Sequence, residues 1–339
     1  GLWTDTDLGY PFDDYVACDV QRGAYYTYNG VPVDGNGQPQ AYGEHPPAFG
    51  VLFLGGPYLD PDNEDNPKYD AEGNQLCNES INGLNFGDTI IDNERYGMTR
   101  YHYYCNSGSA YMHNPDDAGD YYNYLNGFWL DSTRVQYGEW GQPGATGPDC
   151  NFMYPGDSDT CNWGTDGILP NGGLNTPGNY WTEESVGNNP DDRRGLGVSG
   201  PFTFEPGAVH KLDIAYVFAR DFDGTALSSV ELLKERFDYL KDLFENNEDF
   251  FSGITDKKQM GHQLNTYPNP VNEILYFDID NDQAGLEYQI YSANGTLVME
   301  GGFSSGLKHE IDLRTIKEGL YVLKVIGGDQ VYLSKFIKR

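Results

Sequence analysis

The residues best suited to chemistry in this sequence are aspartates that recur at short spacing in two segments. Carboxylate oxygens at alternating positions are ligands that Ca²⁺ prefers, although the glycine and distal glutamate of an EF-hand loop are absent here. An acidic run is also the usual sign of a solvated loop. We expect Ca²⁺ as the one candidate cofactor, bound either by Asp5, Asp7, Asp13, Asp14 and Asp19 or by Asp60, Asp62, Asp65 and Asp70.

Aromatic side chains in segments rich in Gly, Asn and Asp suggest a second kind of site. The face of an aromatic ring stacks on a sugar, and neighbouring polar groups bond to the sugar hydroxyls. Long loops also need aromatic residues for small cores of their own, so the same residues fit a purely structural role. The candidate contacts for a glycan are Trp140, Trp163 and Trp181.

Signals for catalysis are weak. Paired carboxylates serve glycosidases, but a chain with 52 acidic residues always contains some pair. No HExxH motif, nucleophile elbow or phosphate-binding loop is present. We therefore favour a non-catalytic protein and name no catalytic residue. One short motif, Asp88-Thr89-Ile90, resembles the acceptor for periplasmic O-glycosylation in Bacteroidetes, which makes Thr89 a candidate for modification.

Five cysteines show no CxxC or Cys/His spacing of a metal site. In a loop-rich chain with 43 Gly and 27 Tyr, they are typical of disulfides formed in an oxidising compartment. We expect Cys150 to pair with Cys161 and Cys77 with Cys105, which leaves Cys18 unpaired.

The net charge of −31 excludes nucleic acid as a partner, because phosphate binding needs clustered Lys and Arg. The charge is unevenly distributed. Residues 265–339 hold 7 basic and 10 acidic side chains, whereas residues 1–264 hold 14 and 42. The composition changes near residue 265, which predicts a domain boundary there. No run of apolar residues is long enough for a transmembrane helix.

Residues 1–250 read as an acidic, all-β sandwich with long loops and one packed helix at its end. Strand patterns occur at 48–56, 98–105, 200–207 and 210–220. In 225–247, Val230, Leu233 and Phe237 recur at helical spacing, so this helix must bury one face. Residues 251–264 lose periodicity and are expected to form a linker. From Tyr267 a series of short strands predicts a second, smaller sandwich over 265–339.

The second segment also carries motifs that point to a family. Its "YPNPVNEILYF", "YQIYSANGTLV", "IDLRTIKEGLYVLKV" and "YLSKFIKR" follow one another over residues 265–339. In these motifs the segment resembles the type A C-terminal sorting domain of the type IX secretion system of Bacteroidetes.

The resemblance implies an immunoglobulin-like sandwich of seven strands that acts as an export signal. It also implies as partners the translocon, an outer-membrane β-barrel shuttle protein and a sortase-like peptidase. The implied location is outside the cell or on its surface, reached through the periplasm and across the outer membrane. The residues that match the sorting signal are Tyr267, Pro268, Asn269, Pro270, Gly319, Leu320, Tyr321, Lys335, Lys338 and Arg339.

Residues 1–250 resemble, more distantly, uncharacterised secreted proteins of Bacteroidetes in segments such as "DLGYPFDDYVACD" and "HPPAFGVLFLGGP". We expect a non-catalytic cargo for adhesion, gliding or contact with surface glycans. Two alternatives stay open, namely an accessory domain of a secreted hydrolase whose catalytic domain lies upstream and a calcium-stiffened spacer. Because no Met or signal-like segment opens the chain, we expect that an export signal or a further domain precedes Gly1.

Overall fold

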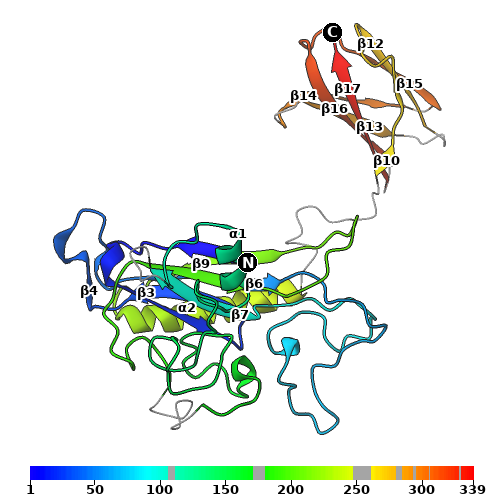
Figure 1. Ribbon diagram of the computed structural model, residues 1–339. Coiled ribbons are helices and arrows are strands. Elements are labelled where there is room, and N and C mark those ends of the chain that lie inside the picture. The colour runs from blue at the N-terminus through cyan, green and yellow to red at the C-terminus, as the bar shows by residue number, and fades with distance from the viewer. Residues whose placement is uncertain are drawn as a thin grey trace. The chain divides into compact units, whose positions relative to one another are not determined.

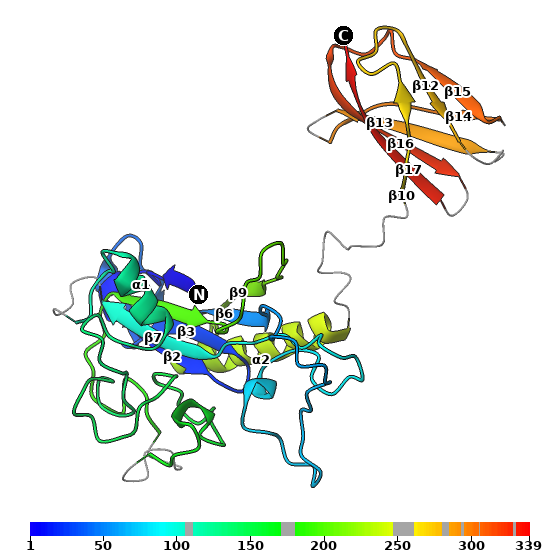
Figure 2. The same cartoon turned by 45° about the vertical axis from the view of Figure 1, so that its right-hand side comes forward.

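The computed structural model describes residues 1–105, 111–170, 180–246, 261–279, 285–292, 295–304, 306–327 and 330–339. The chain divides into two compact units, Gly1–Glu248 and Asp249–Arg339. The two units are described separately below, and Figures 1 and 2 show the elements of each. Among the described residues, neither helix has the length and apolar character needed to cross a membrane.

The first unit is a sandwich of two antiparallel sheets. One sheet has the strand order β2-β3-β6-β9 and the other has the order β1-β8-β7. A small two-stranded sheet pairs β4 with β5. The strands are β1 (Leu2–Asp5), β2 (Asp14–Asp19), β3 (Ala24–Asn29), β4 (Val33–Asp34), β5 (Gly43–Glu44), β6 (Ala48–Gly55), β7 (Arg100–Cys105), β8 (Arg193–Val198) and β9 (Asp213–Ala219).

Close approach of the two sheets depends on glycines in β8. A Cβ added at Gly197 would lie 2.5 Å from the ring of Tyr25, so only glycine leaves room for that tyrosine between the sheets. The ring of Tyr25 also stacks on Tyr101 of β7, with centroids 5.1 Å apart. The resulting core is rich in tyrosine, as the composition predicts.

The helix α2 (Ala226–Asn246) confirms the one helix that the sequence predicts. Its residues Val230, Leu233 and Phe237 are buried against the four-stranded sheet. A Cβ at Gly50 of β6 would lie 2.6 Å from Phe237, so this glycine sets how closely the helix packs. Figures 1 and 2 show α2 along one face of the sandwich and a second, short helix, α1, on the opposite side.

Several elements of the first unit differ from the sequence-based expectation. The helix α1 (Ala118–Leu125) was not expected; Asp117 caps it by accepting hydrogen bonds from Gly119 N and Asp120 N. The strands β1 to β5 and β8 were not predicted either; in β8 the glycines weaken the strand pattern. Conversely, residues 200–207 form no strand, since Pro201 and Pro206 lack the N–H groups that a ladder requires.

The second unit contains eight strands among its described residues, in sheets of order β10-β17-β16-β13-β14 and β11-β12-β15. The sandwich expected over 265–339 is confirmed, while β10 lies in the expected linker and pairs in parallel with β17. The strands are β10 (Gly261–Gln263), β11 (Thr266–Tyr267), β12 (Ile274–Asp278), β13 (Leu286–Ser292), β14 (Leu297–Phe303), β15 (Lys308–Asp312), β16 (Gly319–Gly327) and β17 (Gln330–Lys338).

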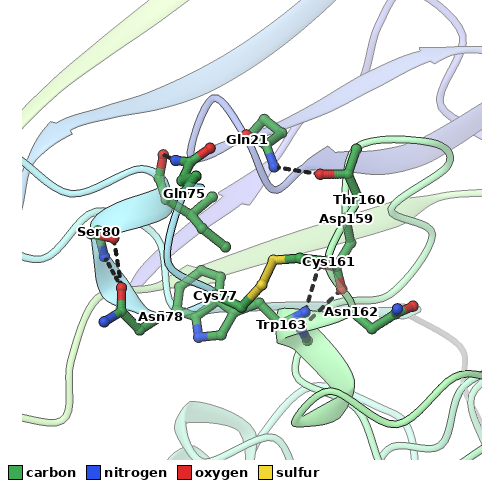
Figure 3. The surroundings of a disulfide bond; sticks show 12 residues. Gln21, Gln75, Cys77, Asn78, Ser80, Asp159, Thr160, Cys161, Asn162 and Trp163 are labelled. Atoms are coloured by element: carbon green, nitrogen blue, oxygen red, sulfur yellow. Dashed lines mark hydrogen bonds between the residues drawn. A yellow bond between two sulfur atoms is a disulfide. The ribbon is translucent and has the colours of Figure 1, made fainter. Parts of the chain in front are cut away.

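A disulfide joins two long loops of the first unit, and it is not a predicted pair. Cys77 bonds to Cys161 across 84 residues, with Cα atoms 6.0 Å apart (Figure 3). Both expected pairings, Cys150 with Cys161 and Cys77 with Cys105, are therefore wrong. Cys150 is buried in the core, and Cys105 ends β7. Cys18 is unpaired as expected, but so are Cys105 and Cys150.

Candidate functional site

The Tyr-Pro-Asn-Pro segment of the second unit holds the last strand in place. The side chain of Asn269 donates from Nδ2 to Lys335 O at 3.0 Å and accepts at Oδ1 from Ile337 N at 3.0 Å. The main chain of Val271 continues this pairing, because its N–H donates to Ile337 O at 2.8 Å. The asparagine thus replaces one residue of a β-ladder. The Tyr267-Pro268 and Asn269-Pro270 bonds of the segment are both cis.

The other motif residues lie on the same sandwich. In β16 the side chains of Tyr321, Leu323 and Val325 are buried, as expected for a central strand, while Leu320 is exposed. The basic residues Lys335 and Arg339 at the C-terminal end are exposed. The segment of Asn269 therefore joins the entry of the unit to its basic terminus.

Replacing Asn269 with alanine is expected to lower the free energy of unfolding of the second unit by about 1–2 kcal/mol, since two hydrogen bonds to β17 are lost. In a thermal melt of the full chain, the transition of this unit should fall by about 4–8 °C per kcal/mol. The matched control is Asn272→Ala, at an exposed asparagine three residues further on. Equal melting of both variants and the parent would contradict the bridging role.

In the first unit, a cavity of about 560 Å³ opens between α1 and the outer face of the three-stranded sheet. We call it the α1 cleft. The exposed rings of Trp3 on β1 and Tyr121 on α1 line it, together with Tyr104 and Tyr124. Its polar lining residues are Asp5, Asn114 and Arg194. Strand register explains this gathering, because Trp3 and Asp5 of β1 lie opposite Leu196 and Arg194 of β8.

The floor of the α1 cleft is built from packed aromatic rings. The rings of Tyr104 and Tyr124 stack with centroids 4.9 Å apart, and Tyr124 Oη donates to His113 O at 2.7 Å. Burial raises the pKa of Tyr104 to about 12, so its hydroxyl keeps its proton. His102 lies against Tyr124, and burial lowers its pKa to about 3, so the imidazole is neutral. The cleft therefore offers ring faces above a neutral floor.

Asp5, which lines the α1 cleft, belongs to a group of three aspartates that we call the rim. Carboxylate oxygens of Asp5, Asp7 and Asp192 lie within 4.8 Å of one another, which makes them able to hold a cation. Arg194 bonds to Asp5 at 2.9 Å and to Asp192 at 3.0 Å, so part of this charge is already balanced. Partial desolvation, reinforced by Asp5 and Asp192, raises the pKa of Asp7.

The remainder of the first predicted calcium cluster does not join this group. Asp13 accepts from Asn29 Nδ2 and Gly35 N, Asp14 from Leu8 N, and Asp19 from Arg22, and all three aspartates are buried. Burial raises the pKa of Asp14 to about 9, which leaves it a neutral acid at pH 7. A five-aspartate site is therefore wrong. These carboxyl groups hold turns, and Asp192, which the sequence analysis missed, takes their place.

The aspartates of the second predicted calcium cluster do not come together either, in the part of the chain that the structure describes. Its carboxylates accept hydrogen bonds from separate turns: Asp60 from Thr203, Asp62 from Glu64 and Asn66, Asp65 from Gly87 and Thr89, and Asp70 from Glu72 and Asn74. These hydrogen bonds lower the pKa of Asp62 and Asp70. Thr89 itself is exposed on this loop, and its glycosylation stays a prediction.

The three tryptophans proposed for glycan contact do not share a surface. Trp181 is buried between Tyr137 and Tyr154, and its Nε1 donates to Glu139 O at 3.0 Å, so it cannot present a ring to a sugar. Trp163 is half-buried against Phe152. Only Trp140 is exposed. The exposed ring that the sequence analysis missed is Trp3; its signal was strand alternation with Leu2 and Thr4.

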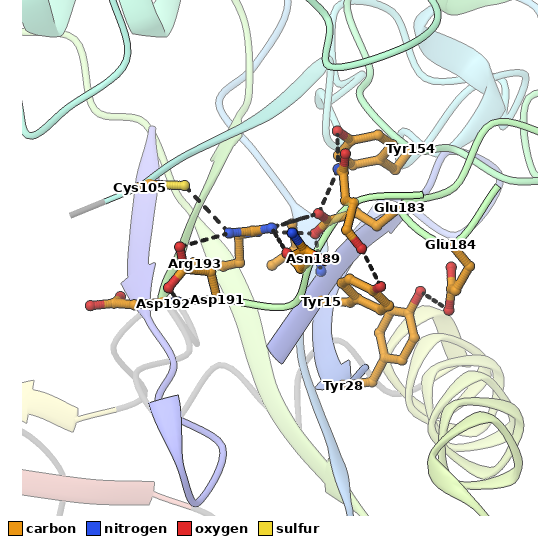
Figure 4. A network of polar contacts seen from close by, with 12 residues as sticks. Tyr15, Tyr28, Cys105, Tyr154, Glu183, Glu184, Asn189, Asp191, Asp192 and Arg193 are labelled. Carbon is orange, nitrogen blue, oxygen red and sulfur yellow. Dashed lines mark hydrogen bonds and ion pairs between the residues drawn. The ribbon is translucent and has the colours of Figure 1, made fainter. Parts of the chain in front are cut away.

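A buried ion pair anchors the long loop that precedes β8. Arg193 Nη2 lies 3.0 Å from Glu183 Oε2, and both side chains are almost fully buried. Figure 4 shows Arg193 between this carboxylate and Cys105, whose sulfur lies 3.5 Å from Nη1. Glu183 also accepts from Val16 N and Asn188 Nδ2. The arrangement satisfies both charges within the protein and exposes neither, so it is structural.

The second sandwich, whose last strand is bonded to Asn269 and ends in exposed basic residues, is thus a compact module of its own that follows the first unit in the chain. Comparison with protein families identifies that module: residues 265–339 match the secretion system C-terminal sorting domain. The chain is thus a type IX secretion cargo, exported across the outer membrane to the cell surface or the medium, and its sorting domain interacts with that secretion machinery.

Other comparisons are sparse. A search of curated proteins found no match. Among solved structures, the chain is similar to a DUF3244 family protein with an immunoglobulin-like β-sandwich fold from Bacteroides vulgatus. The identity is 15%, the alignment covers 22% of this chain and 84% of that chain, and the TM-score is 0.20.

Proposed function

We propose that the first unit is a non-catalytic module that binds neutral glycans in the α1 cleft, for adhesion or gliding at the cell surface. The observation that carries the proposal is the cleft itself, where two exposed rings, Trp3 and Tyr121, stand beside Asp5 and Asn114. Ring faces stack on the CH face of a sugar, while carboxylate and amide groups bond to its hydroxyls. A cavity of about 560 Å³ accommodates a short oligosaccharide.

The charge of the rim supports a neutral ligand. The three carboxylates of Asp5, Asp7 and Asp192 outnumber the one guanidinium, that of Arg194, which pairs with Asp5 and Asp192, and this favours a negative rim. Acidic sugars would be repelled from it, and the net charge of −31 over the whole chain strengthens this repulsion.

A second candidate role follows from the same rim. Three carboxylates at 4.8 Å or less suit a Ca²⁺ ion, which would bridge the end of β1 to the start of β8 and stiffen the sandwich. We therefore also propose that the carboxylates of the rim bind Ca²⁺. For the sorting domain, we propose recognition by the translocon and a β-barrel shuttle protein, followed by removal by a sortase-like peptidase.

Trp3→Ala is expected to weaken glycan binding about 5- to 150-fold, if a sugar stacked on the ring contributes as much as a stacked nucleic-acid base, about 1–3 kcal/mol. The full chain would be screened on an array of neutral and acidic polysaccharides, and the best ligand titrated by calorimetry with Ca²⁺ and with chelator. Trp140→Ala is the matched control, since Trp140 is equally exposed but lies outside the cleft.

The outcomes separate the alternatives. If Trp140→Ala loses glycan binding and Trp3→Ala keeps it, the binding site lies at Trp140 and not in the α1 cleft. Binding confined to acidic polysaccharides, or no binding to any glycan, would refute the proposal. Melting temperatures that are identical with Ca²⁺ and chelator would remove the calcium site, because a bound ion stabilises the folded state by linkage.

A further inference from the structure

The strand β9 leaves one apolar face of the first unit uncovered. Residues of β9 that face α2, such as Val217 and Ala219, are buried, whereas Tyr216 and Phe218 on the opposite side are 57% and 42% exposed. Leu212, just before the strand, is also exposed. The apolar residues that alternate along 212–218 therefore form a face of β9 that the three-stranded sheet does not fully cover. Exposed apolar faces of this kind commonly mark interaction sites.

The same strand ends its sheet. In the order β2-β3-β6-β9, no strand among the described residues pairs with the outer edge of β9. The position of one side chain shows which main-chain groups point outward, because Arg236 of α2 donates to Phe218 O. Main-chain groups of alternate residues point to the same edge in an antiparallel strand, so Ile214 and Tyr216 also direct their N–H and C=O groups outward.

We propose that β9 pairs antiparallel with β9 of a second copy of this chain, about a two-fold axis at Tyr216. In this register Tyr216 lies opposite Tyr216 of the other copy, and Ile214 lies opposite Phe218. All three residues have their main-chain groups on the outer edge, so the register forms a regular hydrogen-bonded ladder. It joins the two four-stranded sheets into one.

Side-chain chemistry favours this particular occupant. The apolar row of Leu212, Tyr216 and Phe218, with the half-buried Ile214 between them, would pack against the same row of the second copy. Pairing therefore buries the three side chains that are exposed in the single chain. At each end of the ladder, Lys211 of one copy meets the acidic turn of Asp221 and Asp223 of the other. A symmetric interface needs such self-complementary charge, because the same patch serves both sides.

Arg236 acts against the pairing. Its bond to Phe218 O occupies an edge acceptor that the second copy needs, and charged side chains at strand edges are a common guard against association. The net charge of −31 on each chain adds long-range repulsion, which physiological salt screens beyond about 8 Å. The dimer is thus expected to be reversible and to form at moderate salt. This inference does not rest on glycan binding.

The test is sedimentation equilibrium of the full chain at 0.15 M salt over a range of concentrations. The parent chain is expected to dimerise. Tyr216→Glu, which places two carboxylates together at the axis, should weaken the dimer at least tenfold. Tyr239→Glu is the matched control at an exposed tyrosine of α2 and should leave it unchanged. Arg236→Ala, which frees Phe218 O, should tighten the dimer severalfold.

Three results would overturn the proposed dimer. A parent chain that stays monomeric at the highest soluble concentration overturns the proposal, as does a dimer that Tyr216→Glu leaves intact. A third result is a chain that stays monomeric and binds a polysaccharide, with binding abolished by Tyr216→Glu. The exposed face of β9 would then be a glycan-binding surface, and the proposed dimer would be wrong. Circular dichroism and melting of each variant exclude misfolding, and hydrogen exchange should show protection of the Ile214, Tyr216 and Phe218 amides only in the dimer.

Discussion

Glu183→Ala is expected to lower the free energy of unfolding of the first unit by about 3–5 kcal/mol. The substitution leaves the Arg193 guanidinium buried without its carboxylate at 3.0 Å, and an uncompensated charge in the interior is expensive. It also removes the acceptor of Val16 N and of Asn188 Nδ2. Because Glu183 joins the loop before β8 to β2, local packing should loosen as well. Urea denaturation at pH 7 measures the effect.

The neighbouring residue supplies the control. Glu184→Ala removes a carboxylate that bonds to Tyr28 Oη at 2.7 Å but is exposed, so the expected loss is below about 1 kcal/mol. The double variant Glu183→Leu with Arg193→Met should lose less than Glu183→Ala alone, since it buries no charge. Similar losses for Glu183→Ala and Glu184→Ala would show that the ion pair does not hold the loop.

The buried carboxyl group of Asp14 is expected to lower the free energy of unfolding as the pH rises from about 4 to 9. Burial is the main cause that raises its pKa from 3.8 to about 9 in the folded chain. Between these values the unfolded chain loses the proton and the folded chain keeps it. The contribution of Asp14 to the free energy of unfolding should therefore be most favourable below about pH 4 and fall towards pH 9, by up to about 1.4 kcal/mol per pH unit. Asp14→Asn, which is neutral throughout, should remove this part of the slope.

The comparison is made by chemical denaturation at pH 5, 7 and 9. Relative to the parent, the Asn variant should gain about 1.6 kcal/mol at pH 5 and several kcal/mol at pH 9. Asp157→Asn, at an exposed aspartate, controls for the change in net charge. Parallel pH profiles for the parent and Asp14→Asn would mean that Asp14 is ionised in the folded chain.

Local chemistry allowed much of this protein to be predicted. The spacing of Val230, Leu233 and Phe237 predicts both the helix α2 and its buried face, because helical periodicity depends only on neighbours a few residues away. The motifs of 265–339 predict a sorting domain, and the family match confirms it. Burial of alternate residues in β16 likewise follows from strand geometry alone.

Partners far apart in the chain were decided only by the tertiary structure. Cys77 meets Cys161 across 84 residues, and the α1 cleft joins Trp3 to Tyr104, Tyr121 and Arg194. No local pattern encodes these distances, since they depend on which strands become neighbours. The exposed face of β9 shows the same limit. Alternation predicts that its apolar residues share a side, but whether that side is covered depends on the width of the opposite sheet.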